Sequence, residues 1–387
     1  MNAPLNAPIN AQVSAIVNAL TWAEPARGLA FYTWLSGISG PHQLNSQTIR
    51  LASADASFRR YFRVDALTGG SAGAHSFIIM DAPPEQEDCT PFVKVAALMA
   101  DAGLEAPRVL VWDVSAGFML LTDLGAQTMM DVINPPADLS VIAQPTTLQT
   151  DLFMEAVDAL VRWQLASRPG VLPPYDDALL SRELALFPDW YVAQHRGITL
   201  DVEQRRTLDD AFNHIKANNL QALEGARVFV HRDFMPRNLM VAGPDATERG
   251  ADAPVLGVLD FQDAVYGPIT YDIASLMRDA FLSWEEDFVL DVTVRYWQKA
   301  RKAGLPVGDD FGEFYRAVEW MGLQRHLKIL GIFARLTLRD GKPKYLADTP
   351  RFIKYARAPC ARYRQLGPLM VLLDQIEGNE TRIGYTF

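Results

Sequence analysis

The chain contains 387 residues, of which 49% are apolar, and its formal net charge is −10. This length allows two domains with a large hydrophobic core, and the acidic balance argues against nucleic acid or a membrane surface as a partner, because both require a basic stripe. Two cysteines far apart in sequence, Cys89 and Cys360, give no disulfide framework and no metal-ligand spacing.

The first third of the chain predicts a small sheet with helices. A helical pattern covers about 11–35 and is interrupted near Pro25. Five strand-like runs follow at residues 48–52, 58–64, 77–81, 108–113 and 117–125, with a helical pattern at 90–102 between the third and the fourth. A Gly- and Ala-rich stretch before the third run is typical of a hairpin loop. This order predicts a mostly antiparallel sheet with one helix, forming a first lobe of residues 1–124.

After Gly125 the pattern becomes mainly helical. A long amphipathic helix is predicted at about 148–166. Two short apolar runs, at 228–230 and 255–261, predict strands with a polar loop between them. We therefore predict an α+β protein whose second lobe, residues 125–387, is the larger and mainly helical one.

The two strands of the helical half each lead into a polar motif, VHRDFMPRNLMV from Val230 and VLDFQD from Val258. His-Arg-Asp with an asparagine five residues after the aspartate, followed by Asp-Phe after an apolar strand, are the catalytic-loop and metal-binding motifs of kinases. Phosphoryl transfer requires an acceptor held in line and a triphosphate whose charge is neutralised by Mg²⁺. Asp233 is therefore the candidate base for the hydroxyl proton. The oxygens of Asn238 and Asp260 are the candidate magnesium ligands, because Mg²⁺ prefers hard oxygen donors.

On these motifs, the chain resembles the aminoglycoside phosphotransferase and choline kinase superfamily from about Thr48 onward. The resemblance implies a protein-kinase-like bilobal fold, with a small, mostly antiparallel N-lobe and a larger helical C-lobe. It also implies that LLTDLG is a hinge, where the backbone of Asp123 and Leu124 would hydrogen-bond adenine. Asp272 is expected to brace the catalytic loop, and His231 to be a packed core residue that orients this loop.

The chain departs from the superfamily at the phosphate-binding elements. It has no GxGxxG sequence, and SADASFRRYF occupies the position of the phosphate loop, where Ser57 is a candidate for contacting the nucleotide. Met80 stands where the family usually has a phosphate-binding lysine on the third strand. One of Arg59, Arg60 and Arg63 is expected to supply the missing cation. In a strand the first and last of these share a face and Arg60 takes the other, so the sequence leaves the choice open.

Longer phrases resemble a narrower group, the anomeric sugar kinases of peptidoglycan recycling, which phosphorylate the 1-hydroxyl of N-acetylmuramate and N-acetylglucosamine. The phrases that carry this resemblance are DASFRRYFRV, MDAPPEQED, HRDFMPRNLM, GVLDFQDAVYGPITYD and LKILGIFARLTLRDGKPKYL. That group also has Met before Asp-Ala-Pro-Pro, which makes Met80 a trait of the group.

Four polar residues are candidates for binding the acceptor. Arg237 lies in the catalytic loop, where a cation would steady the γ-phosphate, and Asp263 follows the metal motif, where it would accept hydrogen bonds from sugar hydroxyls. Arg325 and Lys328 recur with Arg335 at helical spacing. Such cations would bind a lactyl carboxylate, and a solvated helix face is the alternative.

Two other functions stay open on the sequence alone. Another small acceptor, such as an aminoglycoside, choline or a different sugar, fits the same motifs, although cationic acceptors require clustered carboxylates or an aromatic cage. A nucleotide-binding pseudokinase would explain Met80 but would not require Asp233. We expect ATP and Mg²⁺ as cofactors, a small-molecule sugar as substrate, no nucleic acid or membrane partner, and a monomer. We also expect a cytoplasmic location, because the N-terminus lacks signal-peptide features and no apolar run approaches the ~20 residues of a membrane span.

Overall fold

The computed structural model describes residues 20–54, 58–67, 75–134, 144–241 and 256–379. The chain forms two compact units, of which the first comprises Met1–Ala126 with Met240–Gln262 and the second comprises Gln127–Leu239 with Asp263–Phe387. The chain therefore passes between the units three times. The first passage lies near the lobe boundary expected at residue 124, and the other two lie on either side of residues 240–262.

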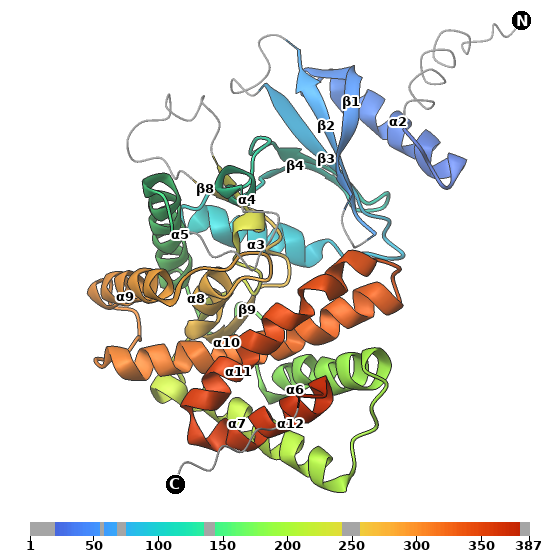
Figure 1. Cartoon of the computed structure of the whole chain (residues 1–387). Coiled ribbons are helices and arrows are strands. Elements are labelled where there is room, and N and C mark those ends of the chain that lie inside the picture. The colour runs from blue at the N-terminus through green and yellow to red at the C-terminus, as the bar shows by residue number, and fades with distance from the viewer. Residues whose placement is uncertain (1–19, 55–57, 68–74, 135–143, 242–255, 380–387) are drawn as a thin grey trace, which may run out of the picture. The chain divides into compact units, whose positions relative to one another are not determined.

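The first unit contains a five-stranded sheet of order β1-β2-β3-β5-β4, in which every neighbouring pair is antiparallel (Figure 1). Its strands are β1 (Leu44–Ala54), β2 (Arg60–Ala66), β3 (Ser76–Asp81), β4 (Val109–Asp113) and β5 (Phe118–Thr122). The predicted antiparallel sheet is thus confirmed, although β1 is longer than expected and β2 begins two residues later. The added residues at the start of β1 include polar ones. The pairing of β1 with β2 also contains register shifts, which interrupt the regular alternation by which a strand is recognised in a sequence.

The two faces of this sheet have different environments. Helix α2 (Pro25–Ser39) covers one face, where its Phe31 and Leu35 pack with Phe62, Val64, Phe77, Ile79, Phe118 and Leu120 of the sheet. Because side chains alternate along a strand, Tyr61, Arg63, Met80 and Met119 lie on the opposite face.

Helix α3 (Thr90–Asp101) follows β3, and the short strand β8 (Leu256–Val258) pairs with β7 (Leu239–Val241).

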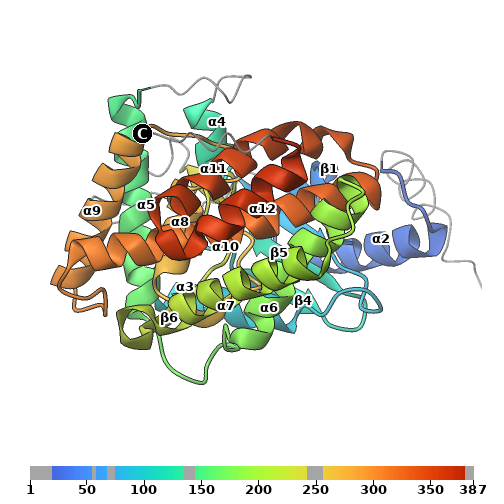
Figure 2. The ribbon, with the colours of Figure 1, turned by 60° about the horizontal axis from the view of Figure 1, so that its bottom comes forward.

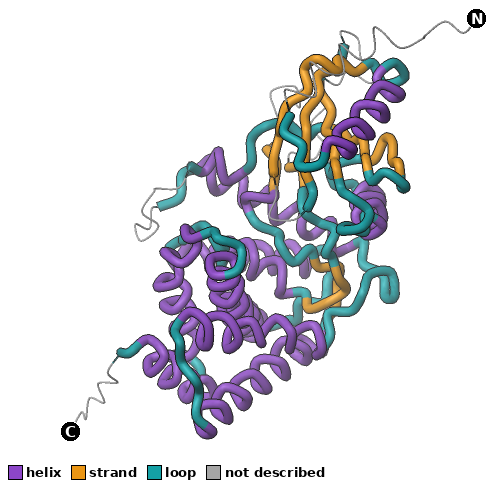
Figure 3. Tube along the Cα trace, turned by 90° about the vertical axis from the view of Figure 1, so that its right-hand side faces the viewer, coloured by secondary structure: helices purple, strands orange, loops and turns teal. Residues whose placement is uncertain are grey.

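The second unit is mainly helical, as predicted (Figure 3). Its longer helices are α5 (Thr147–Leu165), α6 (Asp177–Leu186), α7 (Val202–Gly225), α9 (Glu286–Lys302), α10 (Phe311–Leu338), α11 (Thr349–Arg362) and α12 (Gly367–Glu377). Its shorter ones are α4 (Met129–Ile133), α8 (Thr270–Met277), the π-helix Phe187–His195 and the 3₁₀ segments Pro236–Asn238, Pro343–Asp348 and Arg364–Leu366. Its strands β6 (Arg227–Val230) and β9 (Val265–Pro268) pair antiparallel.

Helix α10 is the central element of the second unit. It packs against α6, α7, α8, α11 and the π-helix, and Figure 2 shows several of these helices side by side with it. Every residue from Ala317 to Gly331 is buried. A Cβ at Gly331 would lie 2.2 Å from the carbonyl oxygen of Leu186, so this close approach requires glycine. Within the described residues of the chain, no helix is long and apolar enough to cross a membrane.

Candidate functional site

The predicted catalytic loop joins β6 to β7. Arg232 has a φ of +77°, and Pro236–Asn238 forms a single 3₁₀ turn. Asn238 Nδ2 donates to the backbone carbonyl of Asp233 at 2.9 Å, so the loop closes on itself and brings two of the predicted site residues together. A positive φ at a non-glycine residue costs free energy and persists only where neighbouring contacts hold it. The contacts around this loop are therefore part of the site.

Asp272 on α8 supplies the first of these contacts. Its fully buried carboxylate accepts hydrogen bonds from the backbone N–H groups of His231 at 2.7 Å and Arg232 at 3.0 Å. Burial raises the pKa of Asp272 to about 6, against the opposing effects of His231 and of these two amides. Nδ1 of the buried His231 in turn accepts from the backbone N–H of Asp233 at 3.3 Å. The expected bracing role of Asp272 and the orienting role of His231 are both confirmed.

A second brace is a buried network centred on Glu183 of α6, which sequence analysis did not identify. Four donors reach its carboxylate, namely Nη2 of Arg232 at 2.6 Å, Nζ of Lys328 at 2.8 Å, Nε2 of Gln324 at 2.9 Å and the hydroxyl of Tyr175 at 2.7 Å. Burial by itself raises the pKa of Glu183, but Lys328 and Arg232 outweigh burial and hold the pKa below its ordinary value. The ionised carboxylate therefore fixes the side chain that precedes Asp233. No motif marks Glu183, since it lies within an ordinary helical pattern and its burial is the informative signal.

Arg325 and Lys328 are buried within this region and do not form a solvated helix face, which was the alternative to an anion site. Lys328 Nζ also donates to the hydroxyl of Tyr271 at 3.2 Å. Arg325 Nη1 donates to the carbonyl of Arg232 at 2.7 Å, and its guanidinium lies 4.9 Å from the Tyr271 ring centroid. Both cations are thus engaged inside the unit next to the catalytic loop, and their binding of a lactyl carboxylate stays a prediction that these contacts do not support. Helical spacing was misleading here because all faces of this part of α10 are buried.

We expect Glu183→Gln to lower the free energy of unfolding by about 3 kcal/mol, because it leaves two buried cations without their counter-charge. Burial lowers the pKa of Lys328, and Glu183 at present more than offsets that effect. In the variant, burial dominates, so the folded state loses a proton that the unfolded chain keeps. The stability of the variant should therefore rise with pH below about 10, the usual pKa of a lysine in an unfolded chain, unlike that of the wild type.

Urea unfolding across this pH range measures the effect. Adding Lys328→Met to the Glu183→Gln variant should remove the pH dependence, because the titrating amine is gone. A loss of stability that is the same at every pH in the single variant would contradict the ionic role of Glu183.

The two predicted magnesium ligands lie next to points where the chain passes between the units. Asn238 belongs to the second unit, one residue before its segment ends, and Asp260 belongs to the first unit, two residues before Gln262 ends that segment. Strand β8 ends at Val258, earlier than predicted. Asp260 has a φ of +61°, and Gln262 Nε2 donates to Asp260 Oδ1 at 3.0 Å. An amide oxygen and a carboxylate are hard donors, and strained backbone is typical of ligand-binding positions. Each residue therefore carries a donor that suits Mg²⁺, and their joint binding of the metal stays a prediction.

The predicted hinge comprises the end of β5 and the turn that follows. The carboxylate of Asp123 accepts from Nε and Nη2 of Arg63 at 2.5 and 3.0 Å, from the Ser76 hydroxyl at 2.7 Å and from the Gly125 amide at 3.0 Å. Arg63 Nη2 also donates to the carbonyl of Gly125 at 2.6 Å. Leu124 packs closely on Gly257 of β8, where a Cβ would come within 2.8 Å of its side chain. These contacts hold the hinge backbone and engage the guanidinium of Arg63, so the expectation that Arg63 binds phosphate is not supported.

Arg60 lies on the face of the sheet that α2 covers. Asp81, which is 1% exposed, accepts hydrogen bonds from Nε and Nη2 of both Arg60 and Arg27 at 2.5–3.0 Å. The Arg60 guanidinium also lies 4.1 Å from the ring of Trp22. Because a buried carboxylate is costly unless it is paired, this cluster fastens α2 to the end of β3. Arg60 therefore has a structural role, and these contacts do not support the expectation that it binds the nucleotide. Ser57 lies outside the described residues.

Arg59 directly precedes β2. Its Nε lies 3.9 Å from Oε2 of Glu87, and the Arg59 side chain is 11% exposed. The second oxygen of Glu87 accepts from the backbone N–H of Phe58 at 3.3 Å. Glu87 thus holds both the backbone and the side chain at the point where the segment before β2 enters the sheet.

Arg237 and Asp263 lie beside the catalytic loop of the second unit. Arg237 is exposed, and its guanidinium is 4.7 Å from the ring of Phe281. The carboxylate of Asp263 is 64% exposed and lies 4.0 Å from Nη1 of Arg232. Both side chains are open to solvent next to the predicted base, and their binding of the acceptor stays a prediction.

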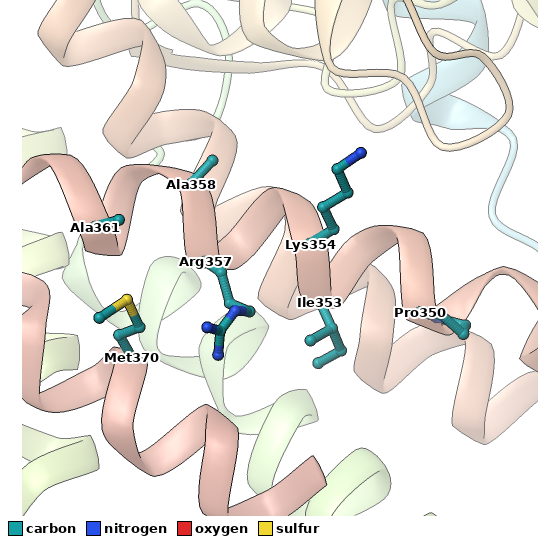
Figure 4. Close-up of a pocket in the computed structure, with 7 residues that line it drawn as sticks. All are labelled: Pro350, Ile353, Lys354, Arg357, Ala358, Ala361 and Met370. Atoms are coloured by element: carbon teal, nitrogen blue, oxygen red, sulfur yellow. The ribbon is translucent and has the colours of Figure 1, made fainter. Parts of the chain in front are cut away.

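An open groove of about 420 Å³ lies elsewhere in the second unit, between α11 and α12 (Figure 4). Its lining includes Ile353, Arg357 and Met370 but none of the candidate residues described above. Arg357 forms an ion pair with Asp374 of α12. The groove offers neither a carboxylate base nor a set of hard metal ligands, so it does not compete as a phosphoryl-transfer site.

This chain is similar to a family of known enzymes, to individual bacterial kinases and to solved structures. Residues 48–311 match the model of the phosphotransferase enzyme family. The N-acetylmuramate/N-acetylglucosamine kinase of Pseudomonas aeruginosa is 49% identical over 326 residues, which cover 84% of this chain and 87% of that protein. The enzyme of the same name from Neisseria meningitidis serogroup B is 46% identical over 340 residues, covering 88% and 94%. The solved structure of an ethanolamine kinase from Plasmodium vivax has a TM-score of 0.58 at 10% identity, covers 93% of this chain and 98% of that one, and shows a shared fold.

Proposed function

The chain belongs to the phosphotransferase enzyme family, and from this premise we propose that it transfers the γ-phosphate of ATP to the 1-hydroxyl of N-acetylmuramate and N-acetylglucosamine. The observation that carries this choice of acceptor is the identity shared with amino-sugar kinases over more than four-fifths of the chain. The resemblance also implies a place in the recycling of peptidoglycan sugars.

The catalytic loop supports phosphoryl transfer in particular. Asp233 would accept the proton of the attacking hydroxyl, since its backbone is fixed on one side by His231 and on the other by Asn238. The oxygens of Asn238 and Asp260 would hold Mg²⁺, which when bound neutralises charge on the phosphates. The exposed Arg237 would meet the γ-phosphate or the acceptor, and Asp263 would accept hydrogen bonds from sugar hydroxyls.

The remaining assignments complete the proposal. The backbone of Asp123 and Leu124 would hydrogen-bond adenine, supported by the contacts that hold the hinge.

A pseudokinase is disfavoured because a binding module would not need an aspartate held as Asp233 is. A monomeric state and a cytoplasmic location stay predictions.

The acceptor is tested by following ³¹P and ¹H NMR spectra of N-acetylmuramate, N-acetylglucosamine, glucose and kanamycin with ATP–Mg²⁺. We expect sugar-1-phosphates from the two N-acetyl sugars. Glucose should react at least about 10²-fold less efficiently, because polar groups that bind the N-acetyl group would be left unpaired. Methyl glycosides of the N-acetyl sugars should give no product, since the reacting hydroxyl is blocked. Phosphate on a 3- or 6-hydroxyl, or on kanamycin alone, would refute the acceptor while leaving the family intact.

A further inference from the structure

The first unit lacks a cation at the third-strand position where kinases of this superfamily use lysine. Met80 occupies that position and is fully buried. Its strand partners are Tyr61 of β2 and Met119 of β5, and all three lie on the sheet face opposite α2. This inference rests on the proposed kinase function. If the chain binds ATP, the phosphates of the nucleotide require a cation from another element on this face.

Two of the three nearby arginines are already used elsewhere. Arg60 lies on the α2 face and donates to Asp81 at 2.5 and 3.0 Å. Arg63 shares the face of Met80, but it is paired with Ile78, farther along β2 toward the hinge. Its guanidinium donates three hydrogen bonds to Asp123 and Gly125 at 2.5–3.0 Å. Moving either arginine to a phosphate would remove a positive charge and two hydrogen bonds from a nearly buried carboxylate, at a cost that a ligand contact would have to offset.

Arg59 differs from both in its position on the sheet. It lies two residues before Tyr61 and directly before β2. If the alternation of β2 is continued by one residue, Arg59 is directed toward the face of Met80. Its Nε lies 3.9 Å from Oε2 of Glu87. Glu87 is itself fixed, because it also accepts the amide of Phe58 at 3.3 Å.

We propose that Arg59 is the phosphate-binding cation of this enzyme and that Glu87 is its positioning residue. Kinases of this fold pair a third-strand lysine with a glutamate of the following helix. Here the cation comes from the residue before β2 and the acid from the segment before α3. The chain thus keeps a pair of a cation and a glutamate, but both partners come from other positions. An arginine offers a planar fork of donors, which suits two phosphate oxygens at once.

The test compares nucleotides with and without a polyphosphate. Binding of ATP–Mg²⁺, ADP–Mg²⁺ and adenosine is measured by calorimetry for the wild type, Arg59→Met, Arg59→Lys and Glu87→Gln. Arg59→Met should weaken ATP–Mg²⁺ and ADP–Mg²⁺ by about 10- to 100-fold, as expected for a lost charge-assisted contact, and leave adenosine unchanged. Arg59→Lys should recover part of the loss. Glu87→Gln should weaken ATP–Mg²⁺ by about 2- to 5-fold, because it removes only the positioning ion pair.

The matched control is Arg50→Met, which removes an arginine that is 49% exposed and paired with Asp65 in the same sheet. This control should not change the affinity for any of the three ligands. ATP–Mg²⁺ affinity within twofold of the wild type in Arg59→Met, or an equal loss for adenosine and ATP–Mg²⁺, would overturn the proposal. Failure of the wild type to bind ATP–Mg²⁺ would instead refute the proposed function, so the two failures are distinguishable.

Discussion

Asp233→Asn should lower kcat by about 10²–10⁴-fold, the usual contribution of a general base, while the affinity for ATP–Mg²⁺ stays close to that of the wild type. Asparagine has nearly the same shape as aspartate but cannot take the hydroxyl proton. The backbone N–H and carbonyl of residue 233 make the hydrogen bonds to His231 and Asn238, so the loop should keep its conformation. Release of ADP at saturating sugar measures turnover, and calorimetry measures nucleotide affinity.

The matched control is Asp210→Asn on α7, which makes the same change at a side chain that is 64% exposed. It should leave both kcat and ATP–Mg²⁺ affinity unchanged. If Asp233→Asn retains turnover within about threefold of the wild type, Asp233 is not the base.

Asp260→Asn should remove the dependence of nucleotide binding on Mg²⁺ and lower turnover by at least about 10²-fold, since a bound metal contributes several kcal/mol to transition-state stabilisation. Asparagine is the suitable replacement because Asp260 has a φ of +61°, a region that Asn tolerates and most other residues avoid. The change therefore removes the charge and leaves the backbone in place. ATP affinity with Mg²⁺ and with excess chelator gives the two values to compare.

The control for this variant is Asp65→Asn, which neutralises a carboxylate of β2 that is 40% exposed. It should retain the full difference in ATP affinity between Mg²⁺ and chelator. An Asp260→Asn variant that keeps this difference would show that Asp260 does not hold the metal.

The local motifs were readable from the sequence because their residues are close together along the chain. The spacing of Asp233 and Asn238 follows from one short loop, and a strand before each polar motif is visible as an apolar run. The antiparallel sheet was largely predictable for the same reason, since its five strands lie within one stretch of the chain and only helix α3 separates the third from the fourth. The short strands β7 and β9 were not predicted, because runs of three or four residues carry too little periodicity.

Side-chain partners that are far apart in sequence were decided by the tertiary structure alone. The sequence left the choice among Arg59, Arg60 and Arg63 open. The structure distinguishes them, because Arg63 pairs with Asp123, which is 60 residues away, and Arg60 pairs with Asp81, which is 21 residues away. Likewise, the sequence suggested that Lys328 binds an anion. In the structure, the packing of α10 against α6 places Lys328 beside Glu183, which is 145 residues away. The role of a charged side chain depends on the groups that lie within about 4 Å of it. For these residues, those groups come from segments far away in the sequence, and local periodicity does not encode such long-range packing.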